Sequence, residues 1–150
     1  MTRKADGDGK LDLRTLVYGS FASLDFTRSD LERLHDQAAE RNRENEITGV
    51  LLFNGTHFLQ LIEGRPDAIE ELMGRIRRDS RHVGIEVEHD GPTEDRFFPD
   101  WALGLVHVRG ANVGDSELTA DGLPDGLPEK VRSRFQRMLS DGGPDVDLPD

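Results

Sequence analysis

The chain of 150 residues has no cysteine, one tyrosine and one tryptophan. Without cysteine it has no disulfide framework, no thiolate metal site and no cysteine nucleophile. No apolar run reaches the ~18 residues of a membrane-spanning helix, and the N-terminus lacks the apolar core of a signal peptide. We therefore expect a cytoplasmic protein that is not exported by the general route and does not enter a membrane.

Basic residues are outnumbered by acidic ones. There are 19 Lys and Arg residues against 30 Asp and Glu residues, which gives a net charge of −11 at pH 7. A general nucleic-acid-binding protein needs a basic surface, and an anionic membrane surface repels so acidic a chain. The charge suits a protein that meets small molecules or basic protein partners, although solubility alone also accounts for it.

The length is that of one ordinary domain with two different ends. Residues 1–12 are polar and glycine-rich, and we interpret them as a flexible leader. Residues 13–109 have the apolar patterning of a folded domain. Residues 110–150 form an acidic tail, in which about residues 128–140 have the apolar spacing of a short amphipathic helix. That helix either docks a partner or covers the open face of this protein's own sheet.

Strand and helix periodicities alternate along the domain. The expected elements are strand 13–18, helix 27–42, strands 47–53 and 56–62 joined by Asn54-Gly55, helix 66–78, and strands 83–89 and 102–108. Right-handed crossovers place both helices on the same face of one sheet. We therefore predict an α+β, ferredoxin-like β-α-β-β-α-β-β sandwich, with two helices on one face of a mixed five-stranded sheet and a C-terminal helical tail.

Three polar side chains on these elements are candidates for a site. Tyr18 closes the first strand, and Gln60 lies in an apolar strand, where alternation gives it the same face as Phe58 and Ile62. A buried glutamine amide without partners costs ~1–3 kcal/mol, so Gln60 needs either backbone partners or a ligand. Asn42 ends the first helix, where a C-terminal cap is the simpler interpretation.

The two helices can leave an elongated slot between them. The apolar side chains that would face it are Leu31, Leu34, Ala38, Ile69, Leu72, Met73 and Ile76, and simple packing on the sheet is the alternative. No catalytic or metal-binding pattern accompanies the slot, because the five histidines are scattered and no nucleophile elbow or phosphate loop occurs. We expect neither an enzyme nor a metal site.

Five short motifs follow one another on the expected elements. They are Leu16-Val17-Tyr18-Gly19-Ser20, Asn42 with Ile47-Thr48-Gly49, Phe58-Leu59-Gln60-Leu61-Ile62-Glu63-Gly64, Asp79-Ser80-Arg81-His82, and Arg96-Phe97-Phe98-Pro99-Asp100-Trp101. Each motif is short, but the five together, in this order and spacing, resemble the BLUF family of blue-light sensors that use flavin. The resemblance covers about residues 14–108, and it implies that the slot holds the isoalloxazine ring of the flavin.

The resemblance implies photochemical roles for two residues. Tyr18 matches the tyrosine that donates an electron and a proton to the photoexcited flavin. Gln60 matches the glutamine between that tyrosine and the flavin N5 and C4 carbonyl, whose hydrogen bonds rearrange and shift the spectrum to the red. Rotation and tautomerisation of the amide both remain open, because they differ only in proton positions.

Other matched residues are implied to hold the ring. Asn42 matches the residue at the C4 carbonyl and N3 edge, and Arg81 matches a residue near the C2 carbonyl, with Asp79 beside it. The full cofactor-binding set implied is Asn42, Gln60, Arg81, Asp79, Leu34, Ile76 and Ser20, with Leu34 and Ile76 sandwiching the ring. FAD is the expected flavin, with FMN and riboflavin as alternatives because the family holds mainly the ring.

Trp101 and Leu103 match the pair on the last strand that exchanges places with light. Many members of the family have methionine at the second position, and leucine is stiffer and lacks the thioether. The tryptophan exchange is therefore in question in this chain, whereas the Tyr18–Gln60 photochemistry does not depend on it.

We thus expect a blue-light photoreceptor that binds flavin non-covalently. We expect no effector domain fused to the core, so the output should pass to a separate effector protein or to self-association, and we expect a homo-oligomer, a dimer or larger. One alternative is a flavin-binding or apo interaction module that has lost light signalling, which only Leu103 supports. Another is an acylphosphatase-like enzyme, but the loop Gly19–Ser23 lacks the arginines that its anion site needs.

Overall fold

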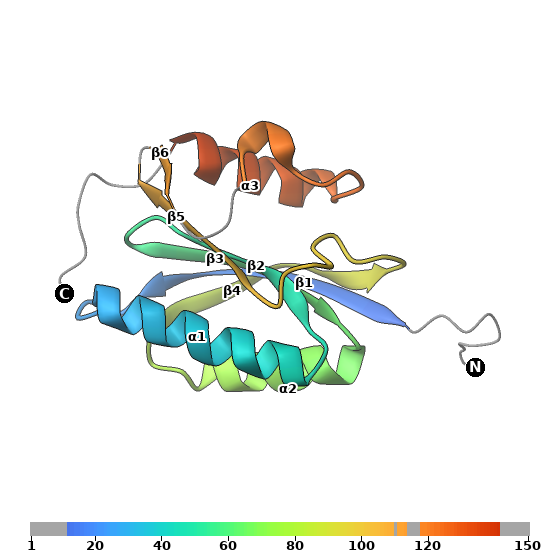
Figure 1. Ribbon diagram of the computed structural model, residues 1–150, viewed down its shortest axis with the longest axis horizontal. Helices are drawn as coiled ribbons and strands as arrows, with labels where there is room; N and C mark the ends of the chain where they lie inside the picture. Colours follow the sequence, from blue (N-terminus) through green and yellow to red (C-terminus); the bar gives the residue numbers. More distant parts are fainter. Residues whose placement is uncertain (1–11, 110, 114–117, 142–150) are drawn as a thin grey trace.

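The computed structural model describes residues 12–109, 111–113 and 118–141. The predicted order of helices and strands is confirmed (Figure 1). The elements are β1 (Leu13–Ala22), α1 (Arg28–Glu44), β2 (Thr48–Phe53), β3 (His57–Gly64), α2 (Pro66–Arg77), β4 (His82–Thr93), β5 (Gly104–Arg109), β6 (Ala111–Val113), the 3-10 helix η1 (Ala120–Gly122) and α3 (Glu129–Asp141). Residues 1–11 of the predicted leader lie outside the described residues.

The sheet has the strand order β4-β1-β3-β2-β5-β6. β3 pairs antiparallel with both β1 and β2, β4 pairs antiparallel with β1, and β5 runs parallel to β2. Each helix therefore connects two parallel strands that flank a third, which is the ferredoxin-like arrangement predicted from right-handed crossovers. The five predicted strands are confirmed, and the short β6 adds a sixth strand antiparallel to β5.

Two strands are longer than their apolar patterns predicted. β1 and β4 pair with each other from Leu13 opposite Thr93 to Ala22 opposite His82. The extra residues are mostly small or polar, so alternation alone did not indicate a strand there. They are extended because each backbone completes the hydrogen-bond ladder of its neighbour.

The helix ends follow from local sequence. α1 begins with a capping box, in which the Thr27 hydroxyl accepts from the Asp30 amide at 3.0 Å and the Asp30 carboxylate accepts from the Thr27 amide at 2.9 Å. α2 begins at Pro66, whose missing N–H costs nothing in the first turn. α1 continues to Glu44 with Asn45 as its C-cap, so the capping interpretation of Asn42 is wrong.

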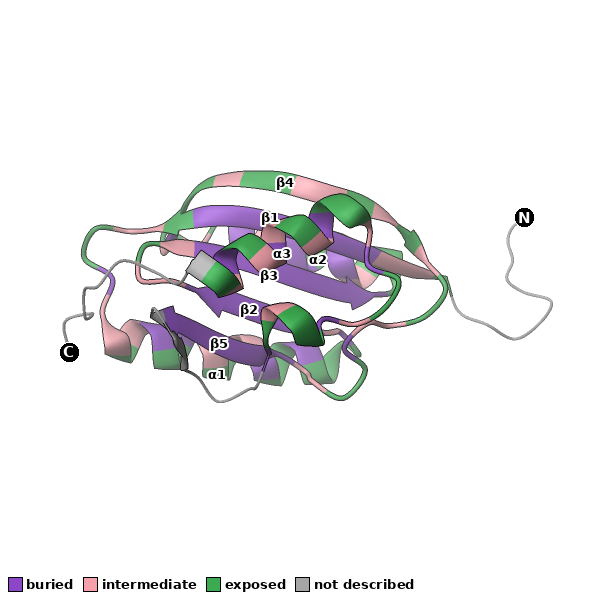
Figure 2. Cartoon of the chain, turned by 90° about the horizontal axis from the view of Figure 1, so that it is seen from above, coloured by how far each residue is buried: buried purple, intermediate pink, exposed green. Residues whose placement is uncertain are grey.

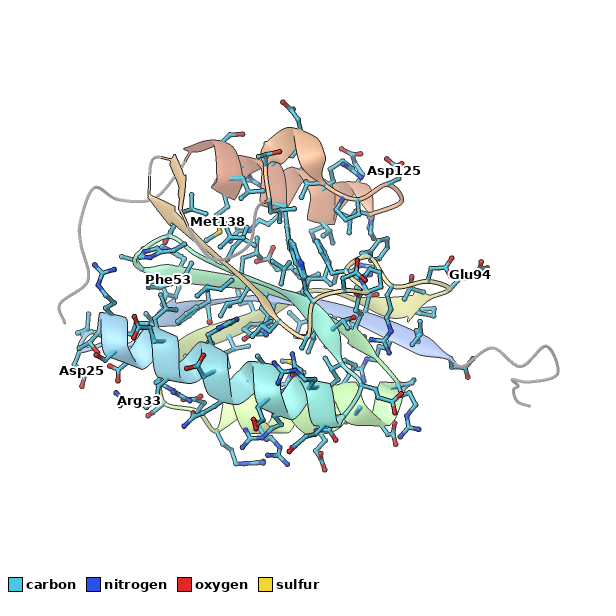
Figure 3. All side chains as sticks on the ribbon, viewed as in Figure 1. Asp25, Arg33, Phe53, Glu94, Asp125 and Met138 are labelled. Carbon is cyan, nitrogen blue, oxygen red and sulfur yellow. The ribbon has the colours of Figure 1, made fainter. Side chains whose placement is uncertain are left out.

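The sheet separates two layers of helices. α1 and α2 cover one face and α3 covers the other (Figure 1). Val131, Phe135 and Met138 of α3 pack on side chains of the inner strands, and Figure 3 shows Met138 between α3 and the sheet. The C-terminal amphipathic helix thus covers the protein's own sheet, which decides between the two alternatives that its sequence left open.

Burial is uneven across the sheet. The inner strands are almost wholly buried, whereas β4 at the edge is largely exposed or half-buried (Figure 2). The central strand β3 has helices on both faces, so each face has its own set of buried side chains. In the described part of the chain, no helix combines the length and the apolar character that crossing a membrane requires.

Candidate functional site

Tyr18 and Gln60 form the centre of the site. They lie directly opposite each other on β1 and β3, and the Tyr18 hydroxyl donates a hydrogen bond to Oε1 of Gln60. Tyr18 packs with the residues of α2 that face the sheet, including Ile69 and Met73, so the pair lies on the α1–α2 face. The shared face of Gln60, Phe58 and Ile62 predicted by alternation is thereby confirmed.

The Tyr18 phenol is held neutral. Its complete burial, and to a lesser degree the negative charge of Asp79, raise its pKa well above the ordinary value of 10.0. The phenol is therefore a hydrogen-bond donor at pH 7. Because Oε1 of Gln60 accepts from Tyr18, the Nε2 amide of Gln60 is left to donate.

Asn42 carries an unpaired buried acceptor. Its Nδ2 donates to the Ala102 carbonyl at 2.8 Å, while its buried Oδ1 has no partner within residues 12–109, 111–113 and 118–141. A narrow cleft between α1 and α2 is lined by Asn42 together with Ile47, Leu72 and Arg75. A buried acceptor without a donor costs ~1–3 kcal/mol, so this position suits a ligand N–H. The flavin N3–H, which the resemblance places at Asn42, fits that requirement.

Asp79 and Arg81 form a two-pronged ion pair in the turn between α2 and β4. Arg81 Nε lies 2.9 Å from Asp79 Oδ1, and Arg81 Nη2 lies 2.8 Å from Asp79 Oδ2. Burial acts to raise the pKa of Asp79, but the Arg81 hydrogen bonds outweigh it and the pKa is lowered. Arg81 Nη2 also lies 3.5 Å from Gln37 Oε1, so its guanidinium reaches α1.

Leu34 and Ile76 are buried on α1 and α2, on the face of the sheet that carries Tyr18. Ser20 lies on β1, also on this face, and its hydroxyl is 2.9 Å from Nδ1 of His82. The structure therefore brings together, on one face of the sheet, the predicted Tyr18, Gln60, Ser20, Leu34 and Ile76. Asn42 lies on α1, and the Asp79–Arg81 pair follows α2 and contacts α1.

His82 is a site residue to which the sequence analysis gave no role. Its buried ring lies edge-on to Tyr18 with centroids 5.8 Å apart, and 4.6 Å from the Phe58 ring. Burial lowers its pKa to about 4, with Asp79 acting to raise it and Arg81 to lower it, so His82 is neutral at pH 7. In the sequence, the one indication of a role for His82 was its place at the end of the Asp79–His82 motif. The motif alone does not indicate that the His82 ring is buried.

Trp101 and Leu103 lie on opposite faces of the sheet. Leu103 is buried with Leu31 and Leu34 on the α1 face. Trp101 is half-buried against the α3 face and stacks on Phe98, with centroids 5.5 Å apart. Both residues precede β5, which begins at Gly104 rather than at the predicted residue 102. Leucine thus occupies the side of the sheet that faces the site, and tryptophan the side that faces α3.

Comparison with known proteins decides the family. The family model described as "Sensors of blue-light using FAD" matches residues 13–104, more than half of the chain. The chain belongs to the BLUF family. It is 38% identical over 96 residues to the photoactivated adenylate cyclase subunit beta of Euglena gracilis, covering 63% of this chain and 11% of that protein. It is 38% identical over 73 residues to the blue light- and temperature-regulated antirepressor BluF of Escherichia coli (strain K12), covering 49% of this chain and 18% of that protein.

Solved BLUF structures resemble the whole fold. The dark-state structure of the BLUF protein BlrB is 37% identical and superposes with a TM-score of 0.61, covering 63% of this chain and 71% of that one. The BLUF structure of BlrP1 is 26% identical with a TM-score of 0.71, covering 95% of this chain and all of that one. The chain is thus a flavin-using blue-light sensor domain, and it spans 11% of the length of the cyclase relative.

Proposed function

We propose that the flavin of this BLUF domain lies between α1 and α2, and that Tyr18 and Gln60 carry its photochemistry. The observation that supports this is the buried hydrogen bond from the Tyr18 hydroxyl to Gln60 Oε1 on the face that α1 and α2 cover. A bound flavin supplies the absorption of blue light and an excited-state electron acceptor. Among the described residues, Tyr18 is the one phenol, and it is in direct contact with an amide that can present either a donor or an acceptor.

The hydrogen bond sets the direction of proton movement. In the dark the raised pKa of Tyr18 keeps its proton on the hydroxyl. When Tyr18 loses an electron, its hydroxyl becomes strongly acidic, and the acceptor in contact with it is Oε1 of Gln60. A rotated or tautomerised Gln60 then presents a different group towards the flavin. The hydrogen-bond change alone accounts for a red-shifted spectrum without a covalent bond.

The neighbouring residues have binding roles in this proposal. The unpaired Oδ1 of Asn42 accepts from the N3–H of the ring. Arg81, oriented by Asp79, donates to the C2 carbonyl, and Leu34 and Ile76 contact the two faces of the ring. Ser20 belongs to the same flavin-binding set, and its hydroxyl contacts His82. FAD is the proposed flavin, in agreement with the description of the family.

We also propose that the chain is a sensor without catalytic activity of its own, and that its output is a contact with a separate effector protein or a second copy of the chain. Its relatives include light-regulated cyclases and an antirepressor, of which this chain matches only a small part. Lost signalling is disfavoured because Tyr18, Gln60 and Asn42 are all present on the α1–α2 side. The cytoplasmic location expected from the sequence stays a prediction.

Tyr18→Phe tests the assignment. The variant keeps the ring that packs under α2 and removes only the hydroxyl, so flavin should stay bound while the light-induced red shift disappears. Absorption spectra in the dark and after blue light measure both. A red shift of normal size in the variant would exclude Tyr18 as the electron and proton donor.

A further inference from the structure

Glu63, three residues after Gln60 on β3, is a completely buried carboxylate. It accepts hydrogen bonds from the Phe97 amide at 2.7 Å, the Phe98 amide at 2.8 Å and the Thr48 hydroxyl at 2.9 Å. Burial raises its pKa, while these three donors and the positive charge of Arg96 act in the opposite direction. A buried carboxylate is tolerated only where its oxygens accept hydrogen bonds, and both oxygens of Glu63 do so.

The two backbone amides that donate to Glu63 belong to one segment, Arg96–Trp101, between β4 and β5. Arg96 donates to the Glu46 carbonyl at 2.8 Å and to the Glu63 carbonyl at 3.1 Å, and at the far end the Trp101 carbonyl accepts from the Gly49 amide at 3.0 Å. Glu63 holds the middle of the segment through two backbone amides. Such bonds to a charged acceptor are about twice as strong as neutral ones.

The two polar residues of β3 face opposite sides of the sheet. Gln60 lies with Tyr18 on the α1–α2 face. Glu63 is an odd number of residues further on and points to the other face, where Phe97, Phe98 and Trp101 pack against the cluster that includes the apolar residues of α3. β3 therefore carries the photochemical amide on one face and the anchor of the tryptophan segment on the other, about 10 Å apart along the strand.

We propose that Glu63 is a positioning residue that transmits the change at Gln60 to the Arg96–Trp101 segment, and through Trp101 to α3. This rests on the proposed role of Gln60. Neighbouring residues of a strand share one stiff backbone, so a shift of β3 at Gln60 moves the Glu63 carboxylate. The Phe97 and Phe98 amides follow it because, among the described residues, no other acceptor satisfies them.

Glu63→Gln tests this link in the flavin-loaded protein. The substituted side chain retains one acceptor oxygen for the segment but replaces the other oxygen with an NH2 group that cannot accept from Phe98 or Thr48. Trp101 is the only tryptophan, so its fluorescence reports on the segment. We expect normal flavin content, a normal red shift and an unchanged dark emission, but a light-induced change in Trp101 emission that is smaller by about fivefold or more, the scale of typical coupling between sites.

Glu86→Gln is the matched control, because it makes the same chemical change at an exposed position on β4 and should alter neither signal. If Glu63→Gln does not fold, Thr48→Val removes one donor to the carboxylate and one acceptor of Arg96 at nearly constant volume. It should reduce the Trp101 change while leaving the red shift intact.

Three results with Glu63→Gln would overturn the link. One is a full Trp101 response, and another is loss of the red shift together with the Trp101 response, which would place Glu63 in the photochemistry itself. The third is an altered dark emission, which would mean that Glu63 only holds the segment in place. A wild-type protein that shifts to the red with no change in Trp101 emission would also overturn it. A wild-type protein that binds flavin but shows no red shift would instead overturn the proposed function, and the link with it.

Discussion

At the scale of single residues, the site combines one satisfied buried contact with one unsatisfied group. Tyr18 and Gln60 are paired, whereas Oδ1 of Asn42 has no donor within the described part of the chain. The first arrangement keeps a neutral phenol in place, and the second leaves an acceptor for a ligand. Together they suit a site that holds a polar ring edge without a covalent bond.

Asn42→Ala should weaken flavin binding by about tenfold or more, because a lost hydrogen bond in a buried site costs roughly 1–3 kcal/mol. Titration of flavin-free protein with FAD, followed by flavin fluorescence, measures the change. Asn45→Ala is the control, since Asn45 lies at the C-cap of α1 and its Nδ2 donates to the Arg41 carbonyl. Equal losses of affinity in both variants would contradict a direct role for Asn42.

His82 should make stability depend on pH. Its pKa is about 4 in the folded chain and about 6.5 when unfolded, so between these values the unfolded state binds the proton and stability falls as pH falls. Glu63, with its raised pKa, contributes in the opposite direction, so a comparison with a variant is needed.

His82→Gln isolates that contribution. The stability advantage of wild type over the variant should shrink by about 2 kcal/mol between about pH 7 and about pH 4.5. Urea unfolding at a series of pH values measures it. A difference that stays constant over this range would mean that folding does not lower the pKa of His82.

The sequence revealed some site residues and missed others, and the two groups differ in how far along the chain their partners lie. Tyr18 could be found because it closes an apolar strand. Gln60 could be found because alternation gives it the face of Phe58 and Ile62, in a strand that the Asn54-Gly55 turn places in a hairpin. The importance of Glu63 and His82 depends on partners more than 30 residues away, Phe97 and Phe98 for one and Ser20 for the other. No local pattern contains that information.

At the scale of elements, α3 is part of the domain. The sequence predicted its helix within one residue at each end, but an amphipathic stripe does not tell whether it meets its own sheet or a partner. In the fold, Phe135 is fully buried on the inner strands and Arg134 pairs with Glu88 of β4 at 3.1 Å. Element ends were less predictable where tertiary pairing sets them, as in β4, whose polar last residues are extended only because β1 lies beside them.

Phe135→Ala should lower the free energy of unfolding by about 3–5 kcal/mol, because it leaves a cavity between α3 and the sheet. Arg137→Ala, at an exposed position of the same helix, should change it by less than about 0.5 kcal/mol. Denaturant unfolding of the two variants measures both. Similar values for both would mean that α3 does not rest on the sheet in solution.

At the scale of the whole molecule, the sheet separates the face on which we propose that flavin binds from the face covered by α3. Tyr18 and Gln60 lie beneath the two crossover helices, and Trp101 lies on the other side with α3. The overall fold could be predicted because the order of elements and the handedness of crossovers leave few topologies. The sequence could not predict that Leu103 faces the site and Trp101 faces away from it, because both residues precede β5, the strand that was expected to carry them.

The absorption spectrum of the purified protein, in the dark and after blue light, tests the central claim most directly. The account predicts a spectrum of bound flavin that shifts to the red on illumination and returns in the dark. Bound flavin with no shift would contradict the roles given to Tyr18 and Gln60. Absence of flavin even after reconstitution with FAD would contradict the site itself.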